Sequence, residues 1–393
     1  MEVMKLMQIT NIRTQGKVSA FPWLLLTTII AISCCFPTSG TSPKNNDDPA
    51  LVQLWDYSFN VAAIATPLLS NDTLFAAADQ YIFALDANTG DVLWQTVNDL
   101  TNYLQATGYV KKGDQIVAHH TNSTKAWNTV TGELEWEFPF NREAGLEPLG
   151  RGRYSVTPKG YAIPSRFNSF YILSDRGELV EHTQVDPKFR VNGVRYFDEK
   201  LFVGQGQTLN GAKTIGRITV LDEQTGDSLW AYNTEHNSFG TPKIVDGVLY
   251  NGTSGNSNFY LFLALDPSSG NAIWEYISNH PLEYVENFII GDDLIFIRSA
   301  AYLFALDRQA GKKQWEFNWS SATIVNIVEK NGFVYASNHY SIFVLDAQTG
   351  ELVHEEPLPE GAGFFWELTI SEEKLFALTS TKLIAYQPWH LRE

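Results

Sequence analysis

The stretch ALDANTGDVLWQT (Ala84–Thr96) decides the fold, because it returns as VLDEQTGDSLWAY (Val220–Tyr232), ALDPSSGNAIWEY (Ala264–Tyr276) and ALDRQAGKKQWEF (Ala305–Phe317). The shared pattern is a small residue followed by x-Asp-x-x-Thr-Gly-x-x-x-Trp. The Asp carboxylate can bind turn amides downstream, and the Gly supplies the positive φ that reverses the chain. Each copy therefore predicts a strand, a tight turn and a second strand.

The motif recurs with a nearly constant period. Its glycines are Gly90, Gly132, Gly226, Gly270, Gly311 and Gly350, with a degraded copy around Gly177. Its tryptophans are Trp94, Trp136, Trp230, Trp274 and Trp315, and His354 stands where the last copy should have one. Successive glycines lie 39 to 49 residues apart. A period in the low forties predicts a four-stranded unit repeated around an axis, which is a β-propeller.

Two further patterns complete the blades and close the ring. A second strand-turn-strand phrase, such as ATPLLSNDTLFAA (Ala65–Ala77), precedes the motif and supplies the other two strands of each blade. The last copy ends at its third strand, whereas the segment around Trp55 matches a fourth strand alone. We therefore predict an all-β fold over residues 51–393. It is an eight-bladed propeller of four-stranded antiparallel blades, closed by the N-terminal strand completing the last blade.

The motif tryptophans are expected to join neighbouring blades. We expect each indole to lie as a buried wedge against the small residue, Ala or Val, of an adjacent copy. A fully buried Trp removes about 150–250 Å² from water, worth on the order of 4–6 kcal/mol before other costs are counted. The docking residues are then Trp55 with the motif tryptophans and glycines named above.

The charge balance excludes one class of partner. The chain has 28 Lys and Arg against 44 Asp and Glu, a formal net charge of −16. The first 34 residues carry three basic residues and one acidic residue, so their removal leaves −18. Such a surface repels phosphate backbones, whose binding depends on Lys and Arg. We expect no nucleic-acid binding.

The N-terminal segment is typical of an export signal. Basic residues precede the apolar run FPWLLLTTIIAIS (Phe21–Ser33), which is short for a membrane span, and both cysteines of the chain follow it as Cys34 and Cys35. The run ends in Ala-Ile-Ser-Cys, which resembles the signal for lipidation at Cys34. We predict a lipoprotein signal peptide over residues 1–34 and a flexible polar linker over residues 35–50. Plain secretion after ordinary cleavage and an uncleaved anchor are the alternatives.

The repeat resembles the tryptophan-docking motif of the propellers named for pyrroloquinoline quinone (PQQ). Eight such blades behind a lipoprotein signal are most similar to the BamB family of outer-membrane β-barrel assembly lipoproteins. That resemblance implies a monomeric, non-enzymatic scaffold that faces the periplasm, touches the membrane only through its lipid and binds other proteins.

The alternative implied by the same motif is a PQQ-binding quinoprotein or dehydrogenase. Those enzymes carry a Cys-Cys pair over the cofactor, calcium ligands and a catalytic Asp. The single Cys-Cys pair here lies in the export signal, and no motif identifies the other groups. We therefore expect no catalytic residue, no cofactor and no metal.

One departure from the repeat suggests a surface for a partner. The longest interval between motif glycines contains GQGQTLNGAKTIG (Gly204–Gly216), which we expect to be a loop. Arg190 and Arg195 stand shortly before it in an otherwise acidic protein, and Arg is enriched at interface hot spots. We predict that these arginines and the loop bind a partner. The alternative is that both arginines pair with local carboxylates.

Overall fold

The motif folds as the hairpin between the third and fourth strands of a blade. In the first copy, Asp86 Oδ1 accepts hydrogen bonds from the N–H groups of Asn88 and Thr89 at 2.7 and 3.1 Å. Gly90 follows with a φ of +79°, which residues with a side chain rarely adopt. The equivalent backbone donors from Thr225 and Gln224 lower the pKa of Asp222. The turn chemistry expected from the sequence is therefore present.

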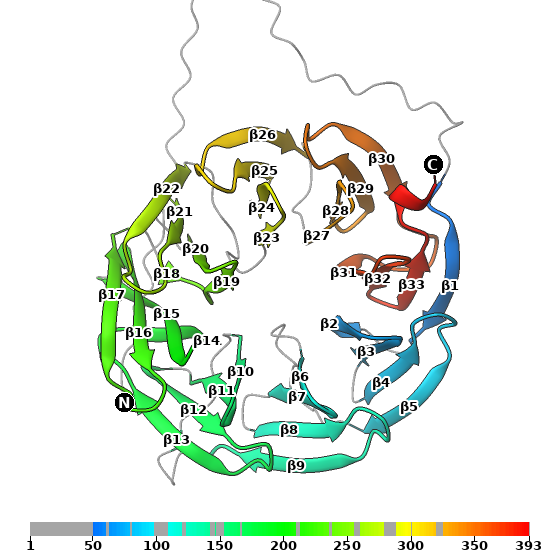
Figure 1. The fold of residues 1–393 in the computed structure, drawn as a ribbon. Coiled ribbons are helices and arrows are strands. Elements are labelled where there is room, and N and C mark those ends of the chain that lie inside the picture. The colour runs from blue at the N-terminus through cyan, green and yellow to red at the C-terminus, as the bar shows by residue number, and fades with distance from the viewer. Residues whose placement is uncertain are drawn as a thin grey trace, which may run out of the picture. The chain divides into compact units, whose positions relative to one another are not determined.

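The computed structural model describes residues 50–59, 63–78, 81–97, 109–119, 123–141, 146, 153–165, 167–209, 213–235, 238–254, 260–278, 288–299, 301–319 and 325–392. Eight antiparallel sheets are arranged around an axis, and the last strand of each sheet lies at the rim (Figure 1). This arrangement confirms the predicted eight-bladed propeller.

The first four blades follow the chain in order. Blade 1 consists of β2 (Ala63–Ser70), β3 (Thr73–Ala78), β4 (Tyr81–Asp86) and β5 (Val92–Val97). Blade 2 consists of β6 (Val110–Lys112), β7 (Gln115–His119), β8 (Ser123–Asn128) and β9 (Leu134–Pro139). Blade 3 consists of β10 (Ser155–Thr157), β11 (Gly160–Pro164), β12 (Ser169–Leu173) and β13 (Leu179–Gln184). Blade 4 consists of β14 (Arg190–Phe197), β15 (Lys200–Leu209), β16 (Lys213–Asp222) and β17 (Ser228–Thr234).

The remaining blades complete the ring. In blade 5 the inner strand is split into β18 (Ser238–Phe239) and β19 (Lys243–Val245), followed by β20 (Val248–Ser254), β21 (Tyr260–Leu265) and β22 (Ala272–Ser278). Blade 6 consists of β23 (Phe288–Ile290), β24 (Leu294–Arg298), β25 (Tyr302–Asp307) and β26 (Lys313–Asn318). Blade 7 consists of β27 (Asn326–Lys330), β28 (Phe333–Ser337), β29 (Ser341–Asp346) and β30 (Leu352–Pro357). Blade 8 consists of β31 (Phe365–Ile370), β32 (Leu375–Thr379), β33 (Lys382–Tyr386) and β1 (Gln53–Ser58), and a 3-10 helix, η2 (Trp389–Leu391), follows.

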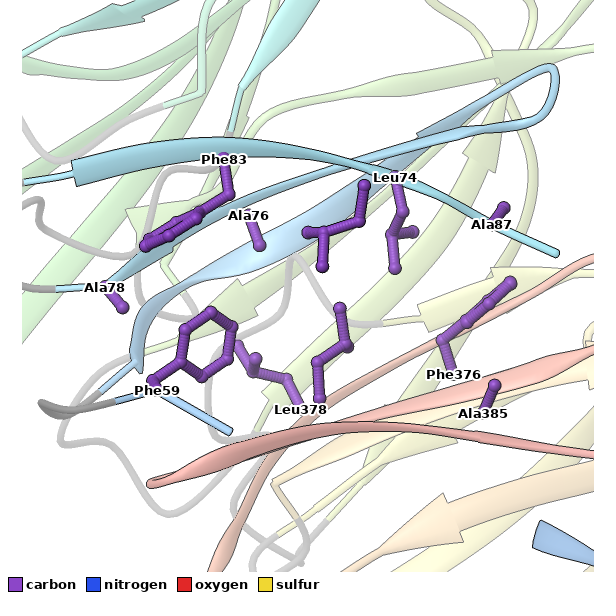
Figure 2. Close-up of a cluster of buried hydrophobic side chains, with 11 residues drawn as sticks. Phe59, Leu74, Ala76, Ala78, Phe83, Ala87, Phe376, Leu378 and Ala385 are labelled. Atoms are coloured by element: carbon purple, nitrogen blue, oxygen red, sulfur yellow. The ribbon is translucent and has the colours of Figure 1, made fainter. Parts of the chain in front are cut away.

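The N-terminal strand closes the ring as the sequence predicts. β1 pairs antiparallel with β33, with Trp55 opposite Ala385. At the seam, Leu74 and Phe83 of blade 1 share a buried cluster with Phe376 and Leu378 of blade 8 (Figure 2). The first and last strands of the propeller are thus joined in one sheet, and a core between blades 8 and 1 packs at the seam.

The indoles of the motif dock on the next blade along the chain. Each indole Nε1–H donates a hydrogen bond of 2.9–3.2 Å to a backbone carbonyl in the motif turn of the next blade. The accepting residue is the one that follows the motif Asp, or the residue that replaces this Asp. The donors are Trp55, Trp94, Trp136, Trp230, Trp274 and Trp315. Each ring also covers a glycine, in the same order Gly90, Gly132, Gly177, Gly270, Gly311 and Gly350. A Cβ atom on any of these glycines would lie 2.5 or 2.6 Å from the ring. Gly therefore serves both the turn and the dock.

Two details of the expected wedge differ from the structure. The partner of the indole is the glycine of the next copy, whereas the small residue lies opposite the tryptophan within one blade, as Ala84 lies opposite Trp94. Of the docking indoles only that of Trp274 is fully buried, at 9% exposure, and the others are half-buried. The rim position leaves part of these five half-buried rings in water, so their docks stabilise less than a fully buried Trp would.

The junction between blades 3 and 4 has no indole dock. Glu181 occupies the tryptophan position, opposite Ile172, and nothing covers Gly226. Lys159 takes over the hydrogen bond instead, because its Nζ donates to the Glu223 carbonyl at 2.7 Å. The same ammonium lies 3.4 Å from the Glu181 carboxylate and 3.3 Å from that of Glu223. An ionic clamp replaces the aromatic one.

The junction between blades 7 and 8 also departs from the motif. His354, at the tryptophan position, stacks on Trp389 of η2 with ring centroids 4.8 Å apart. Its Nε2 lies 2.9 Å from Glu356 Oε2, and that carboxylate accepts the Leu51 N–H at 2.5 Å. The C-terminal helix therefore supplies the aromatic ring that the motif lacks here.

Trp230→Ala is expected to destabilise the fold by about 2–4 kcal/mol, because it removes a half-buried ring and its hydrogen bond to Pro267 O. Urea unfolding measures this loss. The neighbouring Leu229→Ala is the control, since Leu229 is 48% exposed and its loss should stay within about 0.5 kcal/mol. Equal losses in the two variants would contradict the docking role.

Lys159→Gln is expected to destabilise the fold by about 1–2 kcal/mol, because it leaves the buried Glu223 carboxylate without its counter-charge. Adding Glu223→Gln should restore part of the loss. Lys200→Gln is the matched control, because Lys200 pairs with Asp198, which is 73% exposed, and such pairs contribute little. If Lys159→Gln and Lys200→Gln had the same melting temperature, the clamp would have no stabilising role.

Candidate protein-binding cleft

The strands of every blade alternate in direction, so the propeller has two different faces. The hairpin face carries the motif turns and the turns between first and second strands, and the loop face carries the other connections. A cleft of about 450 Å³ opens on the loop face at the junction of blades 3 and 4. Its walls include Phe167, Asn168, Lys188, Phe189, Arg190 and Gln207. This cleft contains one of the two arginines singled out in the sequence.

A tight turn between β13 and β14 positions the basic side chains. Asp186 Oδ1 accepts the Lys188 N–H at 3.0 Å, and the Asp186 carbonyl accepts the Phe189 N–H at 3.0 Å. Pro187 suits the second position of such a turn, because its ring fixes φ. Phe189 is 7% exposed and holds the turn to the blade, whereas Lys188 and Arg190 are exposed.

The opposite wall of the cleft comes from blade 3. The Phe167 carbonyl accepts the Val191 N–H at 2.7 Å, and the Asn168 carbonyl accepts the Val185 N–H at 2.8 Å. These bonds fasten the connection between β11 and β12 to the turn that leads into blade 4. Phe167 is nevertheless 40% exposed, so a fixed aromatic side chain faces solvent beside the basic residues.

The cleft carries a positive charge on an acidic protein. Asp186 pairs with Arg217 at 3.1 Å, and the Arg217 guanidinium lies 5.5 Å from the centre of the Phe189 ring. Lys188 and Arg190 make no ion pair with a carboxylate in the described ranges. Exposed cations next to an exposed aromatic ring suit a partner that offers carboxylates and an apolar side chain.

Arg190 and Arg195, which the sequence predicted to act together, lie at different places on β14. Arg190 lies opposite Gly206 and Arg195 opposite Phe202 on β15, so about 13 Å of strand divides them at roughly 3.3 Å per residue. Arg195 is half-buried and donates from Nε to the Pro242 carbonyl of blade 5 at 3.3 Å. Arg195 therefore lies outside the cleft.

The segment Gly204–Gly216, which the sequence predicted to be a loop, consists mostly of paired strands. Residues 204–209 and 213–216 belong to β15 and β16, which pair as far as Leu209 and Lys213, so the long interval lengthens a hairpin. The glycines of this hairpin allow the backbone of blade 5 to pack closely against it, because a Cβ on Gly204 would lie 1.8 Å from the Gly240 carbonyl oxygen. The sequence did not identify Phe167 or Lys188, because the cleft forms between connections of two blades. Pro187 beside Lys188 was the one local signal.

Other features bear on the remaining predictions. Among the described residues, no group of three or more His, Cys, Asp or Glu side chains could hold a metal ion. No helix in the described ranges is long and apolar enough to cross a membrane. The export signal, Cys34 and the linker to residue 49 lie outside the described residues, so those assignments stay predictions.

Residues 52–156 and 173–363, most of the chain, match the model of a protein family described as outer membrane protein assembly factor BamB. The chain belongs to this BamB family. The residues between the two matched ranges, 157–172, include Lys159 of the ionic clamp and Phe167 of the cleft. No curated protein matches the chain in sequence.

Solved structures share the fold of this BamB-family chain at low identity. BamB from Moraxella catarrhalis is 15% identical with a TM-score of 0.65, and the match covers 86% of this chain and all of that one. A computationally designed protein, Ika8, is 13% identical with a TM-score of 0.67 over 86% and 99% of the two chains. Quinohemoprotein alcohol dehydrogenase ADHIIG from Pseudomonas putida HK5 is 12% identical with a TM-score of 0.62 over 86% and 76%. The fold is thus common to a BamB, a designed protein and an alcohol dehydrogenase.

Proposed function

We propose that this propeller is a non-enzymatic scaffold that binds another protein of the outer-membrane assembly machinery from the periplasmic side. Membership of the BamB family is the observation that carries the proposal. A fixed cleft with exposed cations and an exposed aromatic ring supports it, because Arg and aromatic residues are enriched at interface hot spots.

The cleft is the surface that we propose for the partner. Lys188 and Arg190 would attract carboxylates of an acidic segment, and Phe167 would cover an apolar side chain beside them. Desolvation by the partner would strengthen the charge contacts, because the same charges interact more weakly in water. Arg195 would contribute only indirectly, by fixing blade 4 against blade 5.

Charge reversal in the cleft tests this function. Lys188→Glu together with Arg190→Glu should weaken binding to the host β-barrel assembly complex by at least about tenfold, measured by co-purification and by titration. Arg176→Glu is the control for a charge reversal outside the cleft, since Arg176 is exposed in a turn of the hairpin face. Unchanged binding of the double variant would refute the cleft as the partner site. Saturable stabilisation by PQQ with calcium, with turnover of alcohols, would refute the non-enzymatic role.

We further propose that Cys34 carries a lipid that holds the propeller at the membrane. Cys34→Ser should abolish incorporation of labelled palmitate and release the protein from the membrane fraction of a Gram-negative host. Cys35→Ser is the matched control and should stay lipidated. Absence of palmitate in the unaltered protein would favour plain secretion instead.

A further inference from the structure

A group of four rings lies on the loop face at the junction of blades 7 and 8. His339 is in contact with Tyr340, Phe364 and Trp366, at centroid distances of 6.4, 5.4 and 6.2 Å. We call these four residues the aromatic patch. Tyr340 is 66% exposed, Trp366 39% and Phe364 37%, and the other exposed aromatic side chains among the described residues are those of Phe167 and Phe197. An exposed apolar cluster of this kind marks an interaction site.

The backbone beneath the aromatic patch is rigidly held. Asn338 Oδ1 accepts the N–H groups of Tyr340 and Ser341, both at 2.7 Å. The Phe365 N–H donates to the His339 carbonyl at 3.2 Å, and His339 Nδ1 lies 3.2 Å from the Phe365 carbonyl oxygen. Because a carbonyl oxygen can only accept, the imidazole carries a hydrogen on Nδ1. A partner that binds here meets a backbone and a His339 ring that are already held in place, which lowers the entropy cost of binding.

The segment that builds the aromatic patch carries only negative charge. Residues 331–373 contain no Lys and no Arg. Glu360, in the connection that leads to Phe364, is exposed, whereas Glu355 and Glu367 accept hydrogen bonds from Ser341 and Asn326. Aromatic faces and carboxylates both attract cations, so the two features favour the same class of ligand.

We infer that the aromatic patch is a second docking surface, which accepts an arginine- or lysine-bearing segment of a partner protein. The cationic side chain would lie over the faces of Trp366 and Tyr340, with Glu360 supplying the opposite charge. An anionic membrane surface is disfavoured, because the carboxylates would repel it. This inference extends the proposed scaffold function by naming a second partner chemistry, and it does not depend on the cleft between blades 3 and 4.

The two surfaces have opposite signs on one face of the ring. Lys188 and Arg190 give the cleft its positive charge, and the glutamates give the aromatic patch a negative surrounding. The surfaces are four blades apart in an eight-bladed ring, so they lie on opposite sides of the axis (Figure 1). One scaffold could therefore hold two partners, or two segments of one partner, of different charge.

A labelled heptapeptide, Gly-Arg-Gly-Arg-Gly-Arg-Gly, is the probe for the aromatic patch, and its citrulline counterpart is the uncharged control of the same shape. Fluorescence anisotropy with the full chain should show saturable binding of the arginine peptide only. Trp366→Ala and Tyr340→Ala should each weaken binding by about fivefold, the factor expected for an exposed cation–π contact. Trp366→Phe should retain most of the affinity, which separates the loss of a ring from a fold defect.

Three controls make the result decisive. Phe197→Ala removes a ring with the same 39% exposure at a turn of the hairpin face, and it should leave binding unchanged. Lys188→Glu with Arg190→Glu should also leave peptide binding unchanged, so failure of the cleft and failure of the patch are distinguishable. Equal binding of the citrulline peptide, or unchanged binding by Trp366→Ala, would overturn the inference. Trp366-dependent binding to phosphatidylglycerol vesicles would overturn it in favour of a lipid surface.

Discussion

The docking of an indole on the glycine of the next blade is the interaction on which this structure depends. A single four-stranded blade exposes both of its faces, and only stacking against neighbours removes them from water. The dock fixes each neighbour through one hydrogen bond of 2.9–3.2 Å and one close ring contact. Because the same glycine needs positive φ for its turn and lacks a Cβ for the ring, one residue type satisfies both constraints.

The two junctions without an indole dock also carry the two candidate interaction surfaces. Lys159 replaces the dock between blades 3 and 4, and the cleft opens on the other face of that junction. His354 and Trp389 replace it between blades 7 and 8, and the aromatic patch lies on the other face of that junction. The docks belong to the hairpin face and the surfaces to the loop face, so binding residues can vary without loss of a blade contact.

Some of the acidic residues have a structural role in the turns of the blades. Many carboxylates sit in the motif turns, where Asp86 and its equivalents accept backbone N–H groups. These aspartates are part of the fold, and repeating the turn accounts for five of the 44 acidic residues, Asp86, Asp222, Asp266, Asp307 and Asp346. Against that background, exposed cations such as Lys188 and Arg190 create a local positive field, which is the basis of the binding that we propose for an acidic partner.

The repeat by itself determined the fold class, the number of blades and the closure by the strand of Trp55, because these follow from periodicity and from local turn chemistry. A departure from the repeat drew attention to Arg190, whose role in binding stays a prediction. Tertiary structure alone decided that the indole rests on glycine, that Arg195 faces blade 5, and that Phe167 and Lys188 line one cleft. These arrangements bring together residues of different blades or connections, and no local pattern encodes how far one blade is rotated against the next. The export signal and Cys34 remain predictions from sequence.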